Sequence, residues 1–161
     1  MYSYDGLRDS LTNLASPAFF YEELRRAASR VERSEGQFSI IRLVLRVAAD
    51  GKSADTAKTV KPDDFEIIRF ADVLIRMCRG EDLCARLGSA EFLVLLFAPE
   101  SAAESYIHRV AHNWHAPIED QHRSFEDSPI DLFSSISTSR LGLSPLDLLQ
   151  NLDNKALVLT V

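Results

Sequence analysis

Arg79 and Asp82 are the residues whose types and spacing best suit the binding of a ligand. The arginine guanidinium offers a planar fork of hydrogen-bond donors to phosphate oxygens, and the carboxylate can accept hydrogen bonds from the same ligand. The spacing also has a purely structural interpretation, because a basic residue in the last turn of a helix, followed by Gly80, is typical of a capped helix end. For the pair alone, both interpretations stay open.

Three histidines, His108, His112 and His115, share one face of a predicted helix, because their spacing follows the 3.6-residue turn. Such a stripe can bind a metal or respond to pH. It lies away from the apolar stripe of the same helix, so we interpret it as a solvated polar face and predict no metal site. Four arginines of an earlier helix are interpreted in the same way, namely Arg25, Arg26, Arg30 and Arg33.

The composition is that of an ordinary globular chain. Its 161 residues are 46% hydrophobic and 26% charged, so we expect one folded domain over residues 1–161. The net charge of -6 excludes a domain that mainly neutralises nucleic-acid phosphates, which requires clustered Lys and Arg. Apolar runs are far shorter than the ~20 residues of a membrane span, and the first residues lack a signal-peptide pattern. We expect a cytoplasmic protein without membrane insertion, with Cys78 and Cys84 as reduced packing residues.

Helices and strands alternate along the chain. Serine and proline signals predict helix starts at Ser16–Pro17, Pro62, Pro99 and Ser144–Pro145, and Gly80 is expected to end the second helix. Apolar runs predict strands at 38–47, covered on both faces, and at 130–139. The run 83–97 predicts a β-hairpin with its turn at Gly88 and Ser89. Segments 49–61 and 118–129 are predicted to be polar connections.

This element order indicates an α/β (α+β) sandwich, in which helices pack on both faces of a mixed central β-sheet that contains the hairpin. From the element order alone, no function follows.

Three stretches of the sequence resemble, in the same order, the motifs of GGDEF diguanylate cyclases. Residues 79–92, RGEDLCARLGSAEF, are similar to the run RxxDxxARxGGDEF. Residues 9–14, DSLTNL, look like the opening DxLTGL, and the segment LLQNLDNKAL, which ends at Leu157, looks like the closing LLxxADxAL. The resemblance covers nearly the whole chain and implies the GGDEF, nucleotidyl-cyclase-like sandwich.

For catalysis, the resemblance implies a reaction in which two facing domains each hold a GTP on the hairpin and metal ions assist phosphoryl transfer. Family members supply hard oxygen ligands from the third GGDEF position and from an aspartate near the end of the first strand. Ala90 stands at the former position, Val44 aligns near the latter, and Arg46 aligns with a second carboxylate. We therefore predict an inactive domain without catalytic residues, metal or cofactor, whose degenerate motif is Gly88, Ser89, Ala90, Glu91 and Phe92.

For ligand binding, Arg79 and Asp82 match the RxxD motif of the family, an inhibitory site where cyclic di-GMP binds away from the hairpin turn. Arg109 on the next helix is near the place where the family often supplies a further arginine. The resemblance thus implies a cyclic di-GMP receptor that binds through these three residues. The alternative is a domain without nucleotide that docks onto a second copy of itself or onto other signalling proteins.

Overall fold

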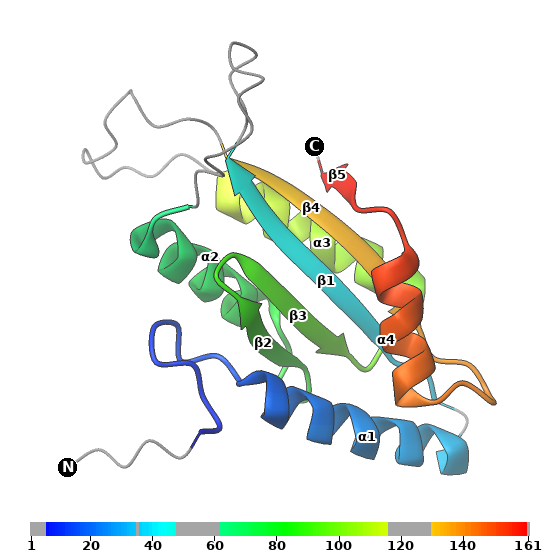
Figure 1. Cartoon of the computed structure of the whole chain (residues 1–161). Coiled ribbons are helices and arrows are strands. Elements are labelled where there is room, and N and C mark those ends of the chain that lie inside the picture. Colours follow the sequence, from blue (N-terminus) through cyan, green and yellow to red (C-terminus); the bar gives the residue numbers. More distant parts are fainter. Residues whose placement is uncertain (1–5, 35, 48–61, 116–129, 161) are drawn as a thin grey trace.

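The computed structural model describes residues 6–34, 36–47, 62–115 and 130–160. The two predicted connections, 49–61 and 118–129, lie outside these ranges. The described elements follow one another in the order shown in Figure 1: α1 (Pro17–Ser34), β1 (Ser39–Val47), α2 (Asp64–Met77), β2 (Leu83–Gly88), β3 (Glu91–Leu96), α3 (Glu100–His115), β4 (Ile130–Thr138), α4 (Pro145–Asn154) and β5 (Val158–Thr160).

The strands form a five-stranded sheet in the order β2-β3-β1-β4-β5. The predicted sandwich class is confirmed, but the sheet is antiparallel between all neighbouring strands and not mixed. The reason is the hairpin, because β3 inserts between β1 and β2, which run in the same direction. One isolated parallel bridge joins Ala15, which precedes α1, to Ala85 of β2.

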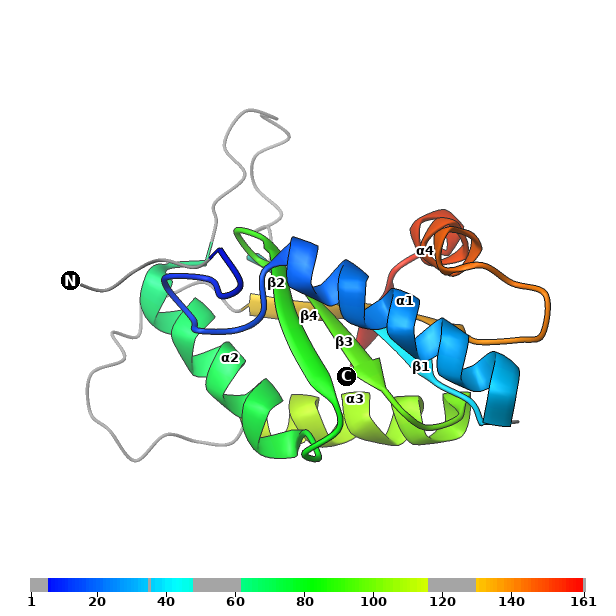
Figure 2. The ribbon, with the colours of Figure 1, turned by 90° about the horizontal axis from the view of Figure 1, so that it is seen from below.

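The helices cover the two faces of the sheet in pairs, α1 with α4 and α2 with α3 (Figure 2). On the α2/α3 face, the rings of Phe70 and Phe92 lie 5.0 Å apart between centroids, and Trp114 packs edge-on against Phe70. On the α1/α4 face, Phe20 and Leu148 belong to a second buried cluster. Each face of the sheet therefore has its own hydrophobic core.

Strand β1 is covered on both faces only near its start, which corrects the prediction of a fully covered strand. Ile41, Leu43 and Leu45 are buried toward α2 and α3. On the opposite face Ile40 is buried under α1 and α4, whereas Arg46 is exposed. The second half of this face is thus open to solvent beside the hairpin.

Helices α1 and α4 start at the predicted capping signals, whereas α2 starts at Asp64, two residues after the predicted Pro62. The Ser16 hydroxyl accepts a hydrogen bond from the Phe19 amide, and Ser144 forms a capping box with Asp147. Helix α2 is capped by Asp63, and it ends at Met77, with Cys78 already in an extended conformation. The predicted end at Gly80 was therefore too late. Among the described residues, no helix has the length and apolarity needed to cross a membrane.

Candidate functional site

The loop between α2 and β2 carries Arg79 and Asp82. One carboxylate oxygen of Asp82 accepts a hydrogen bond from the Arg79 amide (2.9 Å), and the other accepts one from the Phe97 amide (3.4 Å). The Asp82 amide in turn donates to the Arg79 carbonyl (3.0 Å). Asp82 therefore caps the loop, which agrees with the structural interpretation of the Arg79–Asp82 spacing. Each of its carboxylate oxygens still retains a second lone pair for a ligand.

The Arg79 side chain is exposed, and its guanidinium has no hydrogen bond or ion pair within the part of the chain that the structure describes. Its backbone holds the loop, while its side chain projects into solvent with all its donors available. Arg79 can therefore bind an anion without breaking any contact of the fold.

Arg109 lies on α3, on the side that faces the end of α2. Its guanidinium carbon is 6.0 Å from the centroid of the Tyr106 ring. The Tyr106 hydroxyl donates to the Leu74 carbonyl (3.1 Å) in the last turn of α2 and contacts the Cys78 sulfur. The structure thus brings Arg109 to the same end of α2 as Arg79, and both side chains are exposed.

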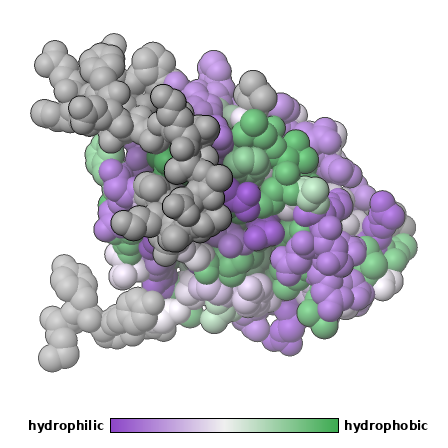
Figure 3. Space-filling model, turned by 45° about the horizontal axis from the view of Figure 1, so that its top comes forward, coloured by the Kyte–Doolittle hydropathy of each residue, from purple (hydrophilic) through white to green (hydrophobic). Residues whose placement is uncertain are grey.

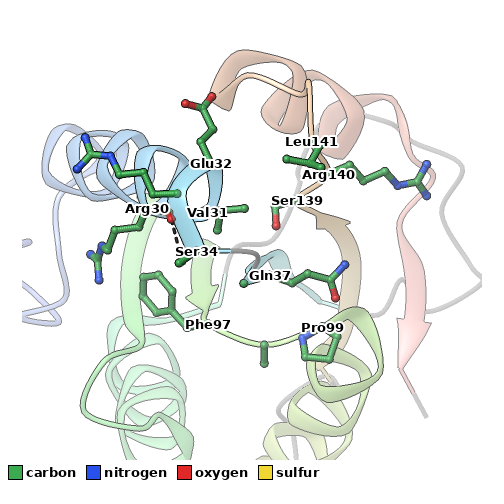
Figure 4. Close-up of a pocket in the computed structure, with 13 residues that line it drawn as sticks. Arg30, Val31, Glu32, Ser34, Gln37, Phe97, Pro99, Ser139, Arg140 and Leu141 are labelled. Carbon is green, nitrogen blue, oxygen red and sulfur yellow. Dashed lines mark hydrogen bonds between the residues drawn. The ribbon is translucent and has the colours of Figure 1, made fainter.

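A hollow of about 940 Å³ adjoins this loop on the α1 side of the sheet. Phe97 and Pro99 line one side of it and Val31 and Leu141 the other (Figure 4). The guanidinium carbon of Arg30 lies 5.1 Å from the centroid of the Phe97 ring. Because the amide of Phe97 also contacts Asp82, Phe97 links the hollow to the RxxD loop.

Arg30 is exposed, as predicted for a solvated helix face, but it also makes a contact that the prediction did not include. Arg25 and Arg26 fit that prediction, since they are exposed and pair with Glu22 and Glu23 of the same helix. Arg30 also covers an aromatic ring from a distant part of the chain. No local pattern in the sequence could have signalled this contact, because it depends on how α1 docks against the end of β3.

The histidine stripe on α3 is exposed at His108, His112 and His115, in agreement with a polar face. The His115 ring stacks on Trp114 with 4.8 Å between centroids. Within the described ranges, no group of three His, Cys, Asp or Glu side chains is placed to hold a metal ion.

The turn of the hairpin is formed by Ser89 and Ala90, and not by Gly88 and Ser89 as predicted. Gly88 is still part of β2 and pairs with Glu91. The register between β2 and β3 shifts between Arg86 and Gly88, which moves the turn one residue further along the chain. The Ala90 carbonyl accepts a hydrogen bond from the Leu45 amide (3.0 Å), so the turn is attached to β1.

The open half of the sheet face beside this turn is lined by arginines. Arg42 pairs with Glu91 across the sheet, with 2.5 Å between Nε and the carboxylate oxygen. Glu91 therefore connects the hairpin to β1. Arg46 stacks over the ring of Phe133, 5.1 Å from its centroid, and pairs in register with Asp131 on β4.

An ion pair between Asp9 and Arg86 joins the DSLTNL segment to the hairpin. The guanidinium of Arg86 lies 3.2 Å from the Asp9 carboxylate and also donates to the carbonyls of Gly88 (3.1 Å) and Ser89 (3.0 Å). Asp9 also accepts hydrogen bonds from the amide (2.8 Å) and hydroxyl (2.7 Å) of Thr12. Asp9 and Arg86 both belong to the motif segments identified in the sequence. Their opposite charges were the one feature of the sequence that could have suggested an ion pair between them.

This segment is attached to β2 through its backbone as well. The Ala15 amide donates to the Cys84 carbonyl (3.0 Å), and the Arg86 amide donates to the Ala15 carbonyl (3.1 Å). Asn13, at the position of the glycine in DxLTGL, has a φ of 60°. Asparagine is one of the few non-glycine residues that tolerate this left-handed conformation, so the loop keeps its shape.

The pKa of Asp9 is set by two opposing effects. Burial raises it, but the hydrogen bonds from Thr12 and the charge and hydrogen bond of Arg86 outweigh burial and leave the pKa below its usual value. A lowered folded-state pKa stabilises the fold above the unfolded pKa of about 3.9, and this stabilisation is lost as the pH falls through the folded value.

We therefore expect Asp9→Asn to lower the free energy of unfolding at pH 7 by about 1.5–3 kcal/mol, because the charged hydrogen bonds to Arg86 are lost. The difference from the parent should start to shrink below about pH 4 and vanish only as the pH falls through the lowered pKa of the folded parent, where its carboxylate is itself protonated. Urea unfolding at several pH values measures both effects. Asp153→Asn, at an exposed acid of α4, is the control, and an equal loss in both variants would contradict a specific role of the pair.

Comparisons with known proteins found a curated relative and a set of similar solved structures. No family model matches the chain. A curated relative, the diguanylate cyclase DgcS of Shewanella oneidensis, is 28% identical over 116 residues. This match includes 71% of the chain but only 38% of DgcS, so the chain spans well under half the length of that relative.

Solved structures of GGDEF domains share the fold over nearly the whole chain. The GGDEF domain of DgcB from Caulobacter crescentus, in complex with c-di-GMP, has a TM-score of 0.75 and 21% identity over 95% of this chain and 86% of its own. The GGDEF domain of YfiN (TpbB) from Pseudomonas aeruginosa has a TM-score of 0.70 and 26% identity over 91% and 84%. Diguanylate cyclase SiaD from the same species, in complex with its activator SiaC, has a TM-score of 0.70 and 21% identity over 91% and 55%. With the DgcS match, the sandwich and the three ordered motifs, these likenesses support a GGDEF-family domain.

Proposed function

We propose that this chain, as a single domain, is a catalytically inactive GGDEF module of the cytoplasm that acts as a receptor for cyclic di-GMP. The observation that carries the proposal is the RxxD loop, in which Asp82 fixes the backbone while the Arg79 guanidinium stays exposed without a partner in the described part of the chain. The DgcB complex with c-di-GMP supports the choice of ligand.

The loss of cyclase activity is inferred from the side chains around the hairpin turn. Ala90 and Val44 have no oxygen atoms in their side chains, so they cannot coordinate Mg²⁺. Glu91 is engaged by Arg42, and Arg46 places a second guanidinium on the same open face. With Glu91 held by Arg42 and a further guanidinium at Arg46, these positions offer no free pair of carboxylates, so the residues present do not fit a two-metal centre.

We expect the purified protein to make no cyclic di-GMP from GTP with Mg²⁺ or Mn²⁺, measured by chromatography of the nucleotides. Ala90→Asp alone should not restore turnover, because Val44 still leaves the strand position without a ligand and the arginines remain. An active GGDEF cyclase assayed in parallel is the control. Turnover by the parent that a hairpin substitution abolishes would falsify the proposal of an inactive domain.

The charge of the ligand explains why several arginines are needed. If cyclic di-GMP binds as an intercalated pair, four negative charges come together and must be offset by cations from neighbouring elements. Arg79 and Arg109 both reach the end of α2. Arg30 supplies a third cation beside Phe97, whose amide donates to Asp82. A second protein chain is the other source of cations.

Calorimetric titration with cyclic di-GMP tests the receptor function directly. We expect a saturable heat, with a stoichiometry of two nucleotides per domain if the intercalated pair binds. GTP should not compete, because it would address the hairpin and not the RxxD loop. No heat at high micromolar nucleotide, together with an empty Arg79 site in a soaked crystal, would contradict the proposal.

The second candidate function is docking onto a protein, and the edge strand β5 is the observation that favours it. Val158 and Leu159 are 64% and 48% exposed, and they line a hollow of about 520 Å³ with Ile107 and Ile136. Figure 3 shows hydrophobic surface gathered at this end of the molecule. The complex of SiaD with its activator SiaC is a precedent for a protein partner.

A second copy of the chain is the partner to test first. An exposed sheet edge can pair with an identical edge through unused backbone groups. Sedimentation at increasing concentration should show a dimer that Leu159→Lys removes, with Leu141→Lys as the exposed control on another surface. A monomer at all concentrations rejects self-docking.

A further inference from the structure

Cys78 and Cys84 approach each other closely although they belong to different elements. Their sulfur atoms are 2.8 Å apart, and both are free thiols. Cys78 is the C-cap residue of α2, and Cys84 is the second residue of β2. The chain between them is the loop that carries Arg79 and Asp82, so the thiol pair closes the base of this loop.

The surroundings hold the two sulfur atoms in place. The Tyr106 hydroxyl lies 3.5 Å from the sulfur of Cys78 and 3.8 Å from that of Cys84, and it donates to the Leu74 carbonyl. Burial raises the pKa of Tyr106 far above its usual value, so the phenol stays neutral. A disulfide bond is about 2.05 Å long, which leaves only a short approach for the sulfur atoms.

The two thiols are not equivalent. Cys78 is partly accessible, whereas Cys84 is buried beneath it. The hydrogen bond from Cys84 lowers the pKa of Cys78, while the same contact and burial raise the pKa of Cys84 well above that of a free thiol. An accessible thiol with a lowered pKa beside a buried thiol is the arrangement of an attacking and a resolving cysteine.

We propose that Cys78 and Cys84 are a modification site that a peroxide oxidises to an intramolecular disulfide. The Cys78 thiolate attacks one peroxide oxygen, the O–O bond breaks, and a sulfenic acid and hydroxide form. The Cys84 sulfur then attacks the Cys78 sulfur, the S–O bond breaks, and the Cys84 proton leaves with the hydroxyl group as water. In sum, two thiols lose two electrons and two protons, and the peroxide is reduced to two waters.

The disulfide would be reversible, because thiol reductants attack such bonds by exchange. It would also fix the loop at both of its ends, and Arg79 and Asp82 lie between those ends. The oxidation of the two cysteines does not depend on what this loop binds. The disulfide proposal can therefore be tested independently of the receptor function.

The test uses the folded protein, treated with hydrogen peroxide and then denatured for a count of free thiols and an intact mass. We expect both thiols to disappear together, with a mass loss of two hydrogen atoms, a cross-linked peptide joining Cys78 and Cys84, and full recovery with dithiothreitol. Cys84→Ser should leave a sulfenic acid at Cys78 that dimedone traps, and Cys78→Ser should leave Cys84 reduced.

Cys78→Ser provides the readout if substitution of the buried Cys84 prevents folding. Three outcomes would overturn the proposal: no loss of thiols, sulfinic acid at Cys78 with Cys84 still free, or cross-links only between molecules.

Discussion

Arg79→Ala is expected to weaken the binding of cyclic di-GMP by about thirtyfold, which corresponds to about 2 kcal/mol. The variant removes a guanidinium that can make two charge-assisted hydrogen bonds to one phosphate or base edge. The same guanidinium is exposed and has no hydrogen bond or ion pair with the described residues, so the stability of the fold should change by less than about 0.5 kcal/mol. Calorimetry measures the affinity, and thermal unfolding verifies that the fold is intact.

Arg25→Ala is the matched control for this measurement. Arg25 is an exposed arginine that pairs with Glu22 on the distant face of α1, and its loss should change the affinity little. Asp82 is a less suitable probe, because its carboxylate holds the amides of Arg79 and Phe97 as well as any ligand. Equal affinities of the parent and of Arg79→Ala would place the ligand elsewhere and reject the RxxD site.

Phe92→Ala is expected to lower the free energy of unfolding by about 3–5 kcal/mol, because it opens a cavity in the core. Phe92 is fully buried, packs against Phe70 and ends the GSAEF motif on the α2/α3 face of the sheet. A loss of this size is a large part of the 5–15 kcal/mol by which domains are usually stable. Urea unfolding at low temperature should show it as a lower midpoint with an unchanged slope.

Phe65→Ala is the matched control, since Phe65 on α2 is 64% exposed and its loss should cost about 0.5 kcal/mol or less. Phe92→Leu keeps most of the buried volume and should fall between the two. If Phe92→Ala were as stable as Phe65→Ala, the result would contradict the position of Phe92 in the core.

The sequence by itself determined the features that depend on neighbours along the chain. Ser16 and Ser144 started helices as predicted, because a hydroxyl cap and the proline that follows act within one turn. The run 83–97 formed the hairpin, because two apolar stretches were separated by a short polar break. The ordered motifs identified the family for the same reason, since each is a local pattern of types and spacing.

Local signals failed where a single residue decided a boundary. The last helix ends at Asn154, and Ala156 is exposed before β5. Strand β5 has three residues and exists through its pairing with β4, which no periodicity within so short a segment can reveal. The end of α2 was misplaced because Asp82, four residues beyond Cys78, folds the chain back.

The tertiary structure decided which side chains meet. Arg42 and Glu91 are 49 positions apart, and Asp9 and Arg86 are 77 apart, so their pairing depends on strand register and on the docking of the DSLTNL loop. The register follows from burying one face of each strand, and a shift by one residue would turn these side chains to the opposite face. Arg30 beside Phe97 and the contact between the two cysteines follow from helix docking in the same way. Such contacts result from the burial of distant surfaces against one another, which is a property of the whole fold and not of any segment.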